Sequence, residues 1–109
     1  MDLADVCFDI VEAIPHPYRF TFTDQLIPAS ISIASNIAEG SRRPTKAYLN
    51  HLSISVGSHA EVETLFELLS RRTLVPATLL GKGIALIEPL GKLLYGLTAS
   101  LQARLDSQS

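Results

Sequence analysis

A histidine and a glutamate four residues apart, His59 and Glu63, form the first pair in this sequence with a spacing suited to chemistry. On a helix, residues four apart share one face. Carboxylates in three other segments, Glu12, Glu39 and Glu88, raise the hypothesis of a metal-dependent bundle enzyme. Di-iron bundles of this kind carry Glu-x-x-His motifs, and this sequence contains none. Because the motif and the number of ligands both fall short, we expect no metal, no cofactor and no enzymatic activity.

Nucleophilic catalysis has even less support. The single cysteine, Cys7, falls on the apolar face of an acidic helix, where burial disfavours the thiolate. There is no Gly-x-Ser-x-Gly turn and no glycine loop that would cradle a phosphate. One cysteine excludes an internal disulfide, which suits a reducing cytosol. With no signal peptide and no uncharged apolar run of about 20 residues, we expect a cytoplasmic protein without a membrane span.

Three basic residues, Arg42, Arg43 and Lys46, cluster without an acid between them. One copy of this patch is a weak site for a phosphate. If a ring of subunits repeats it, the local field multiplies and nucleic-acid contact becomes a reasonable hypothesis. The net charge of −2 opposes that hypothesis, so nucleic acid stays an alternative partner.

Polar residues recur near the middle of the chain. Asn36 and Glu39 lie at the end of one predicted helix, and Glu61, Glu63 and Thr64 lie midway along the next. A short turn between antiparallel helices would bring Glu39 near the arginines that follow it. Because half-buried carboxylates need partners, we interpret these residues as a structural network.

The elements that must position these groups are four helices in one domain, residues 1–109. Apolar residues recur every three or four positions and predict helices over about residues 2–14, 23–40, 44–72 and 76–105. Residues 16–22 are expected to form a loop after Pro15 and Pro17, with Thr23 as the N-cap of the second helix. Pro89 either kinks the fourth helix or divides it into two shorter helices, and we favour one kinked helix. Short connections then favour an up-down-up-down antiparallel four-helix bundle.

The second predicted helix carries two adjoining apolar stripes. Together they are wider than the single apolar face that an ordinary surface helix buries. We assign the stripe formed by Ile27, Ile31, Ala34 and Ala38 to an interface between subunits. Hydrophobic residues make up 47% of the chain and charged ones 18%, which leaves more apolar surface than one small core needs. We therefore expect a homo-oligomer.

Four motifs stand out in the sequence: residues 23–26, residues 32–40, the pair that begins at Gly57, and residues 61–64. Together they resemble the 23S rRNA intervening-sequence protein family. The resemblance covers about residues 20 to 70. It implies a bacterial four-helix bundle, commonly assembled as a ring-shaped homopentamer. It also implies that the motif residues are structural: Asn36, Glu39, Gly40, Gly57, Glu61, Glu63 and Thr64.

A similar bundle serves as the accessory protein of diversity-generating retroelements, where it binds nucleic acid and a reverse transcriptase. The sequence departs from the family pattern in three places. Ile27 and Pro28 stand where the family has two basic residues, Ala34 replaces a proline, and the first helix is shorter than usual. The missing basic pair weakens the transfer of nucleic-acid binding and adds Ile27 to the apolar surface. The favoured hypothesis is thus a non-enzymatic binding or scaffold module, with a nucleic-acid-binding accessory protein as the alternative.

Overall fold

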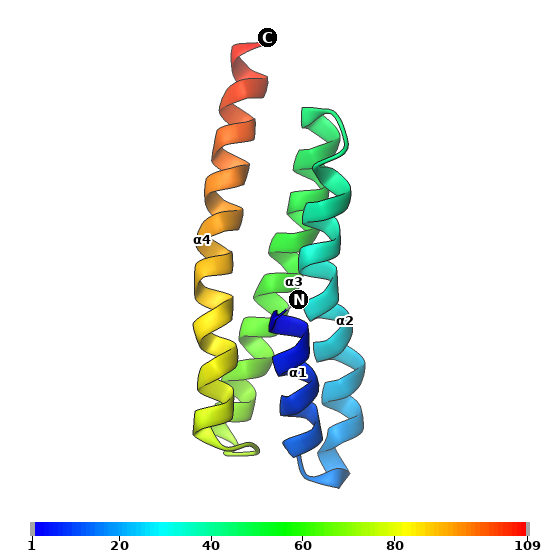
Figure 1. Cartoon of the computed structure of the whole chain (residues 1–109), viewed down its shortest axis with the longest axis vertical. Helices are drawn as coiled ribbons and strands as arrows, with labels where there is room; N and C mark the ends of the chain where they lie inside the picture. Colours follow the sequence, from blue (N-terminus) through cyan, green and yellow to red (C-terminus); the bar gives the residue numbers. More distant parts are fainter. Residues whose placement is uncertain (1, 109) are drawn as a thin grey trace.

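Four α-helices account for most of residues 2–108, the part of the chain that this computed structural model describes (Figure 1). They are α1 (Asp2–Ala13), α2 (His16–Gly40), α3 (Thr45–Arg71) and α4 (Ala77–Ser107). Successive helices run in opposite directions through short turns, and no strand occurs within the described range. The sequence-based prediction of an all-α, four-helix chain is confirmed.

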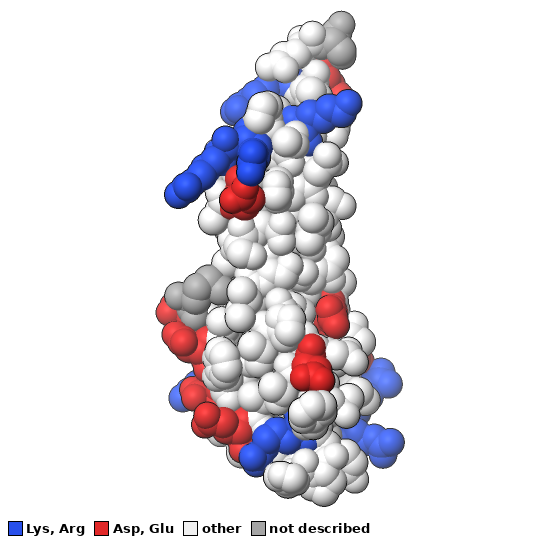
Figure 2. All heavy atoms as spheres, turned by 90° about the vertical axis from the view of Figure 1, so that its right-hand side faces the viewer, with Lys and Arg blue, Asp and Glu red and all other residues white. Residues whose placement is uncertain are grey.

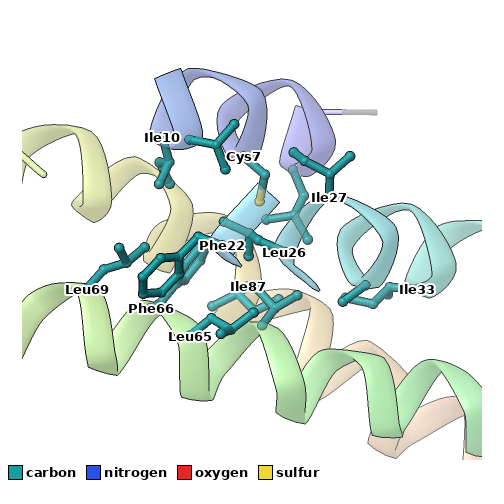
Figure 3. Close-up of a cluster of buried hydrophobic side chains, with 14 of the residues drawn as sticks. Cys7, Ile10, Phe22, Leu26, Ile27, Ile33, Leu65, Phe66, Leu69 and Ile87 are labelled. Carbon is teal, nitrogen blue, oxygen red and sulfur yellow. The ribbon is translucent and has the colours of Figure 1, made fainter. Parts of the chain in front are cut away.

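Helix α1 is amphipathic and is stabilised by what it buries. Leu3, Cys7, Ile10 and Val11 face the other helices, while the acidic residues of α1 face solvent. Burial of a large apolar side chain contributes roughly 1.5–3 kcal/mol. In Figure 3, Cys7 and Ile10 on α1 lie over buried side chains of the other helices, including Phe66.

Helix α2 begins earlier than the sequence indicated. Residues 16–22 are helical, so the predicted loop and the predicted N-cap at Thr23 were wrong. Pro15 occupies the N-cap position, and proline at the start of a helix loses no internal hydrogen bond. Arg19 stabilises the turn between α1 and α2, because its Nε donates to the carbonyl oxygen of Ile14 at 3.1 Å. The hydroxyl of Thr23 donates to the carbonyl oxygen of Arg19 at 2.8 Å, one turn back within the helix.

Helix α4 is continuous through Pro89 and is not divided into two shorter helices, which agrees with the favoured alternative. Its buried seam includes Leu80, Ile87, Leu94 and Leu101, which recur over the whole length of the helix. By length and composition α4 could cross a membrane, a test that core helices of soluble proteins also pass.

The helices differ in length, and this difference shapes the molecule. Helix α1 has 12 residues, whereas α2, α3 and α4 have 25, 27 and 31. Helix α1 packs on α2 and α4, and so does α3, which places α1 and α3 at opposite corners of the bundle. In Figure 1 the N-terminus lies near mid-height and α1 runs downward from it. The lower half is therefore a four-helix bundle, and the upper half contains α2, α3 and α4.

Candidate functional site

The basic residues Arg42, Arg43 and Lys46 are exposed at the upper end of the bundle, around the turn between α2 and α3. Helix α2 ends at Gly40, where a Cβ atom would lie 2.7 Å from both His51 and Tyr48. The glycine therefore lets the two helices approach closely at the turn.

Glu39 pairs with Arg43 through a hydrogen-bonded ion pair one helical turn apart, as the sequence suggested. The hydrogen bond from Arg43 and the charge of its guanidinium lower the pKa of the Glu39 carboxyl, so this carboxylate is ionised at neutral pH. Among the described residues, no salt bridge occupies Arg42 or Lys46. The turn thus presents three cations and one carboxylate.

A polar seam joins α2 to α3 below this turn. The Asn36 Oδ1 atom lies 3.0 Å from His51 Nδ1, and the Asn36 amide donates to the carbonyl oxygen of Ser32 at 3.0 Å. The Ser55 hydroxyl donates to the backbone carbonyl of Ile33 at 2.8 Å. Because buried polar groups need these partners, the seam fixes the register of the two helices. Asn36 thus contacts both helices, and its contact with His51 had no clear signal in the sequence.

The motif residues of α3 divide between the seam and the surface: the Ser58 hydroxyl donates to the Ser32 hydroxyl at 2.9 Å, whereas Glu61, Glu63 and Thr64 lie apart from the seam. Gly57, Glu61, Glu63 and Thr64 are all exposed. Asn36 pairs with His51, ten residues before Glu61, which corresponds to about 15 Å along a helix. The structure therefore separates Glu61, Glu63 and Thr64 from Asn36 and Glu39, which sequence reasoning had placed in one network.

His59 is buried between α3 and α4. Its Nε2 atom lies 2.7 Å from the carbonyl oxygen of Ile87, and its Nδ1 atom lies 3.3 Å from a Glu63 carboxylate oxygen. The ring packs over Gly91, where a Cβ atom would come within 2.8 Å of it. The predicted pairing of His59 with Glu63 is present, and the bond to Ile87 was missed because backbone partners leave no sequence signal.

Within residues 2–108, no group of three or more His, Cys, Asp or Glu side chains is arranged to hold a metal ion. Cys7 is buried, and this burial raises the pKa of its thiol to about 11. The thiol is therefore protonated at neutral pH.

An uncharged belt surrounds the middle and upper part of the bundle. We define it as residues 25–38 of α2, 47–60 of α3 and 93–103 of α4, which contain no Asp, Glu, Lys or Arg. Figure 2 shows one face on which charged side chains gather toward the two ends and leave an uncharged stretch between them. Large apolar side chains are exposed within the belt: Ile54 is 52% exposed, Leu93 50% and Tyr95 79%.

The four residues assigned to a subunit interface lie in different environments. Ile27 packs in the core and is only 9% exposed, so it offers little surface to a partner. Ile31 and Ala38 are exposed, and Ala34 is half-buried. The exposed residues Ile54 and Leu93 were not singled out from the sequence. The length of the uncharged stretches was the signal that could have found them.

A groove of about 350 Å³ opens between α2 and α4 at the start of α1, along the lower edge of the belt, and Asp2 is among the residues that line it. Leu3 lines its lower end, Ile33 and Ala34 line it from α2, and Leu90 and Leu93 line it from α4. The groove lies where a longer α1 would continue. In the lower half of the bundle, α1 covers the apolar surface between α2 and α4. In the groove the corresponding surface is exposed.

Comparison with known proteins gives one family. The family model described as 23S rRNA-intervening sequence protein matches residues 1–96. No curated protein matches the chain.

Proposed function

Because the chain belongs to the 23S rRNA-intervening sequence protein family, we propose that it is a homo-oligomeric, non-enzymatic binding or scaffold module. The uncharged belt is the observation that carries this proposal. Monomeric soluble proteins rarely expose large contiguous apolar surfaces, and such surfaces mark interaction sites. Five subunits in a ring in the cytoplasm is the arrangement we propose.

The positions of the belt residues support self-association. The belt spans three helices of one bundle, so two subunits could each contribute a wide uncharged face that contains exposed apolar side chains. Ala38 and Ile31 are exposed on α2, and the small Ala38 side chain permits close approach of a neighbouring helix. Burial of such surface would stabilise the assembly by about 25 cal/mol per Å² before the cost of association.

Substitution of Ala38 tests the proposal. Ala38→Glu places a charge on an exposed position of the belt, so the subunit should fold and the assembly should dissociate. Ala85→Glu is the matched control, because Ala85 is an exposed helical alanine outside the belt. Light scattering should give about 59 kDa for five copies of the 11.8 kDa wild-type chain and for the control. It should give the monomer mass for Ala38→Glu. A wild-type monomer would refute the proposal.

The basic turn supports a second candidate function, a nucleic-acid-binding accessory protein. Arg42 and Lys46 are exposed and, within the described part of the chain, form no ion pair. A ring would place several such turns at one end and would raise the local positive potential. Binding of a short RNA duplex should then weaken as salt rises.

Neutralisation of two cations separates this candidate from the first. Arg42→Gln together with Lys46→Gln should weaken RNA binding and flatten its salt dependence, and the oligomer mass should stay unchanged. Arg71→Gln together with Arg72→Gln, at the opposite end of α3, is the control. RNA binding that ignores salt would argue against this function.

A further inference from the structure

From the groove and the outer face of α3, we infer that α3 of a neighbouring copy fills the groove and completes the upper half of the bundle. The inference rests on the proposed self-association and names its interface. The groove lacks a helix because α1 begins at its lower end, where Leu3 lines it. The neighbour would present Ile54 and Gly57 to Ala34, Leu90 and Leu93.

The two surfaces lie on opposite sides of one subunit. The groove continues the corner of α1, and α3 occupies the corner opposite to it. Ile54 is exposed on α3, and a Cβ atom built at Gly57 meets no atom within 4 Å. A contact between two different surfaces is heterologous, and it closes into a ring when the rotation between subunits permits.

The heights of the two surfaces agree, as a cyclic ring with its axis parallel to the bundle requires. The bonds Asn36–His51 and Ser55–Ile33 place Ile54 near the level of Ala34. The His59–Ile87 bond sets the register of α3 against α4 and places Ile54 near the level of Leu93. The outer face of α3 is therefore level with the groove in every subunit of such a ring.

Helix direction and charge agree as well. In an up-down-up-down bundle α1 and α3 run the same way, so α3 of a parallel neighbour would enter the groove antiparallel to α2 and α4. Residues 47–60 of α3 contain no Asp, Glu, Lys or Arg over about 21 Å of helix. Apart from Asp2 at the start of α1, the residues that line the groove are uncharged as well. An uncharged helix face would thus cover a groove whose one charged lining residue among those described is Asp2.

Cysteine cross-linking tests the contact directly. Ile54→Cys and Leu93→Cys subunits with different tags are refolded together and treated with a short bismaleimide. Cys7 stays in place because it is fully buried. We expect a cross-linked heterodimer from the mixture, no dimer from either variant alone, and a ladder of multimers from the double variant. Dimers from one single variant alone, or no adduct in a protein that light scattering shows to be oligomeric, would overturn the inference and leave the proposed function intact. A monomeric wild type would overturn both.

A glycine pair provides the second test. Gly57→Arg should reduce the mass to that of the monomer, because the side chain would block entry of α3 into the groove. Gly81→Arg is the matched control: a Cβ atom at Gly81 also meets nothing within 4 Å, and Gly81 lies on α4 outside the belt. Circular dichroism checks that both variants remain helical. An oligomer that persists with Gly57→Arg would contradict the inference.

Discussion

The Nε2 atom of His59 lies 2.7 Å from the carbonyl oxygen of Ile87, so a buried ring on α3 is hydrogen-bonded to the backbone of α4 two residues before Pro89. The other ring nitrogen faces Glu63, whose side chain is mostly exposed. The Nε2 atom of His59 thus joins α3 to α4, and the Nδ1 atom contacts a carboxylate that is exposed to solvent. This bond fixes the register of α3 and α4 near mid-length.

Removal of the His59 ring should destabilise the fold. His59→Ala deletes a buried hydrogen bond and the packing over Gly91, and we expect the free energy of unfolding to fall by about 2 kcal/mol. Glu63→Gln removes only the exposed carboxylate, and we expect a change within about 0.5 kcal/mol. Urea unfolding of both variants measures the difference. Equal losses would mean that the contact with Glu63, and not the bond to Ile87, accounts for the contribution of His59.

Two glycines of α4, separated by one residue, should respond oppositely to alanine. A Cβ atom at Gly83 would lie 2.8 Å from the buried ring of Phe66, whereas one at Gly81 meets nothing within 4 Å. Gly83→Ala should therefore cost about 1–3 kcal/mol through overpacking. Gly81→Ala should gain up to about 1 kcal/mol, because alanine favours the helix. Thermal unfolding of the two variants compares them, and a stabilised Gly83→Ala would contradict the close packing described here.

The buried thiol of Cys7 should make stability depend on pH in alkaline solution. Burial raises its pKa from 9.0 to about 11, against a smaller opposing effect of Ser30. The folded state holds this proton more tightly than the unfolded state. Its contribution is therefore complete below about pH 9 and is lost as the pH rises through 11.

Between pH 7.5 and 10.5, the wild type should lose about 2 kcal/mol more than a Cys7→Ala variant loses. Other groups titrate in this range, and the comparison of the two proteins removes their effect. Urea unfolding at both pH values provides the measurement. Parallel losses in the two proteins would show that Cys7 does not titrate differently on folding.

The Glu39–Arg43 pair should weaken any affinity of the basic turn for nucleic acid. Arg43 lowers the pKa of Glu39, so the carboxylate is ionised at neutral pH and repels phosphates. Glu39→Gln should tighten binding of a short RNA duplex by roughly threefold to tenfold at low salt. Glu67→Gln is the control, because it removes the corresponding exposed pair with Arg71. Fluorescence anisotropy measures both, and equal affinities would exclude a role of this pair in RNA binding.

Helix periodicity was enough to predict four helices, because apolar residues three or four apart mark a buried face wherever the partner lies. The start of α2 was missed for a local reason. Pro15 and Pro17 signal a break after α1, and the same prolines are suited to the first turn of the next helix. Composition alone does not distinguish a loop from the immediate start of a new helix.

The candidate site was harder to predict. Arg42, Arg43 and Lys46 are adjacent in sequence, so their clustering needed no tertiary information. The partners of Asn36 and His59 lie on other helices, 15 and 28 positions away. The short first helix was predicted from the sequence, but the groove was not, because it depends on how α2 and α4 pack beside the start of α1.

Because α1 is short, the lower and upper halves of the molecule should also differ in local stability. Above the start of α1, helix α4 packs within the described subunit on α3 alone. Backbone amides in the upper turns of α4 should therefore exchange their hydrogens with solvent faster than those in its lower half. If a neighbour covers this region, exchange there should slow as the protein concentration rises, whereas the lower half should remain unaffected. The upper half of α4 would then be locally stable in the oligomer and would open readily in the monomer.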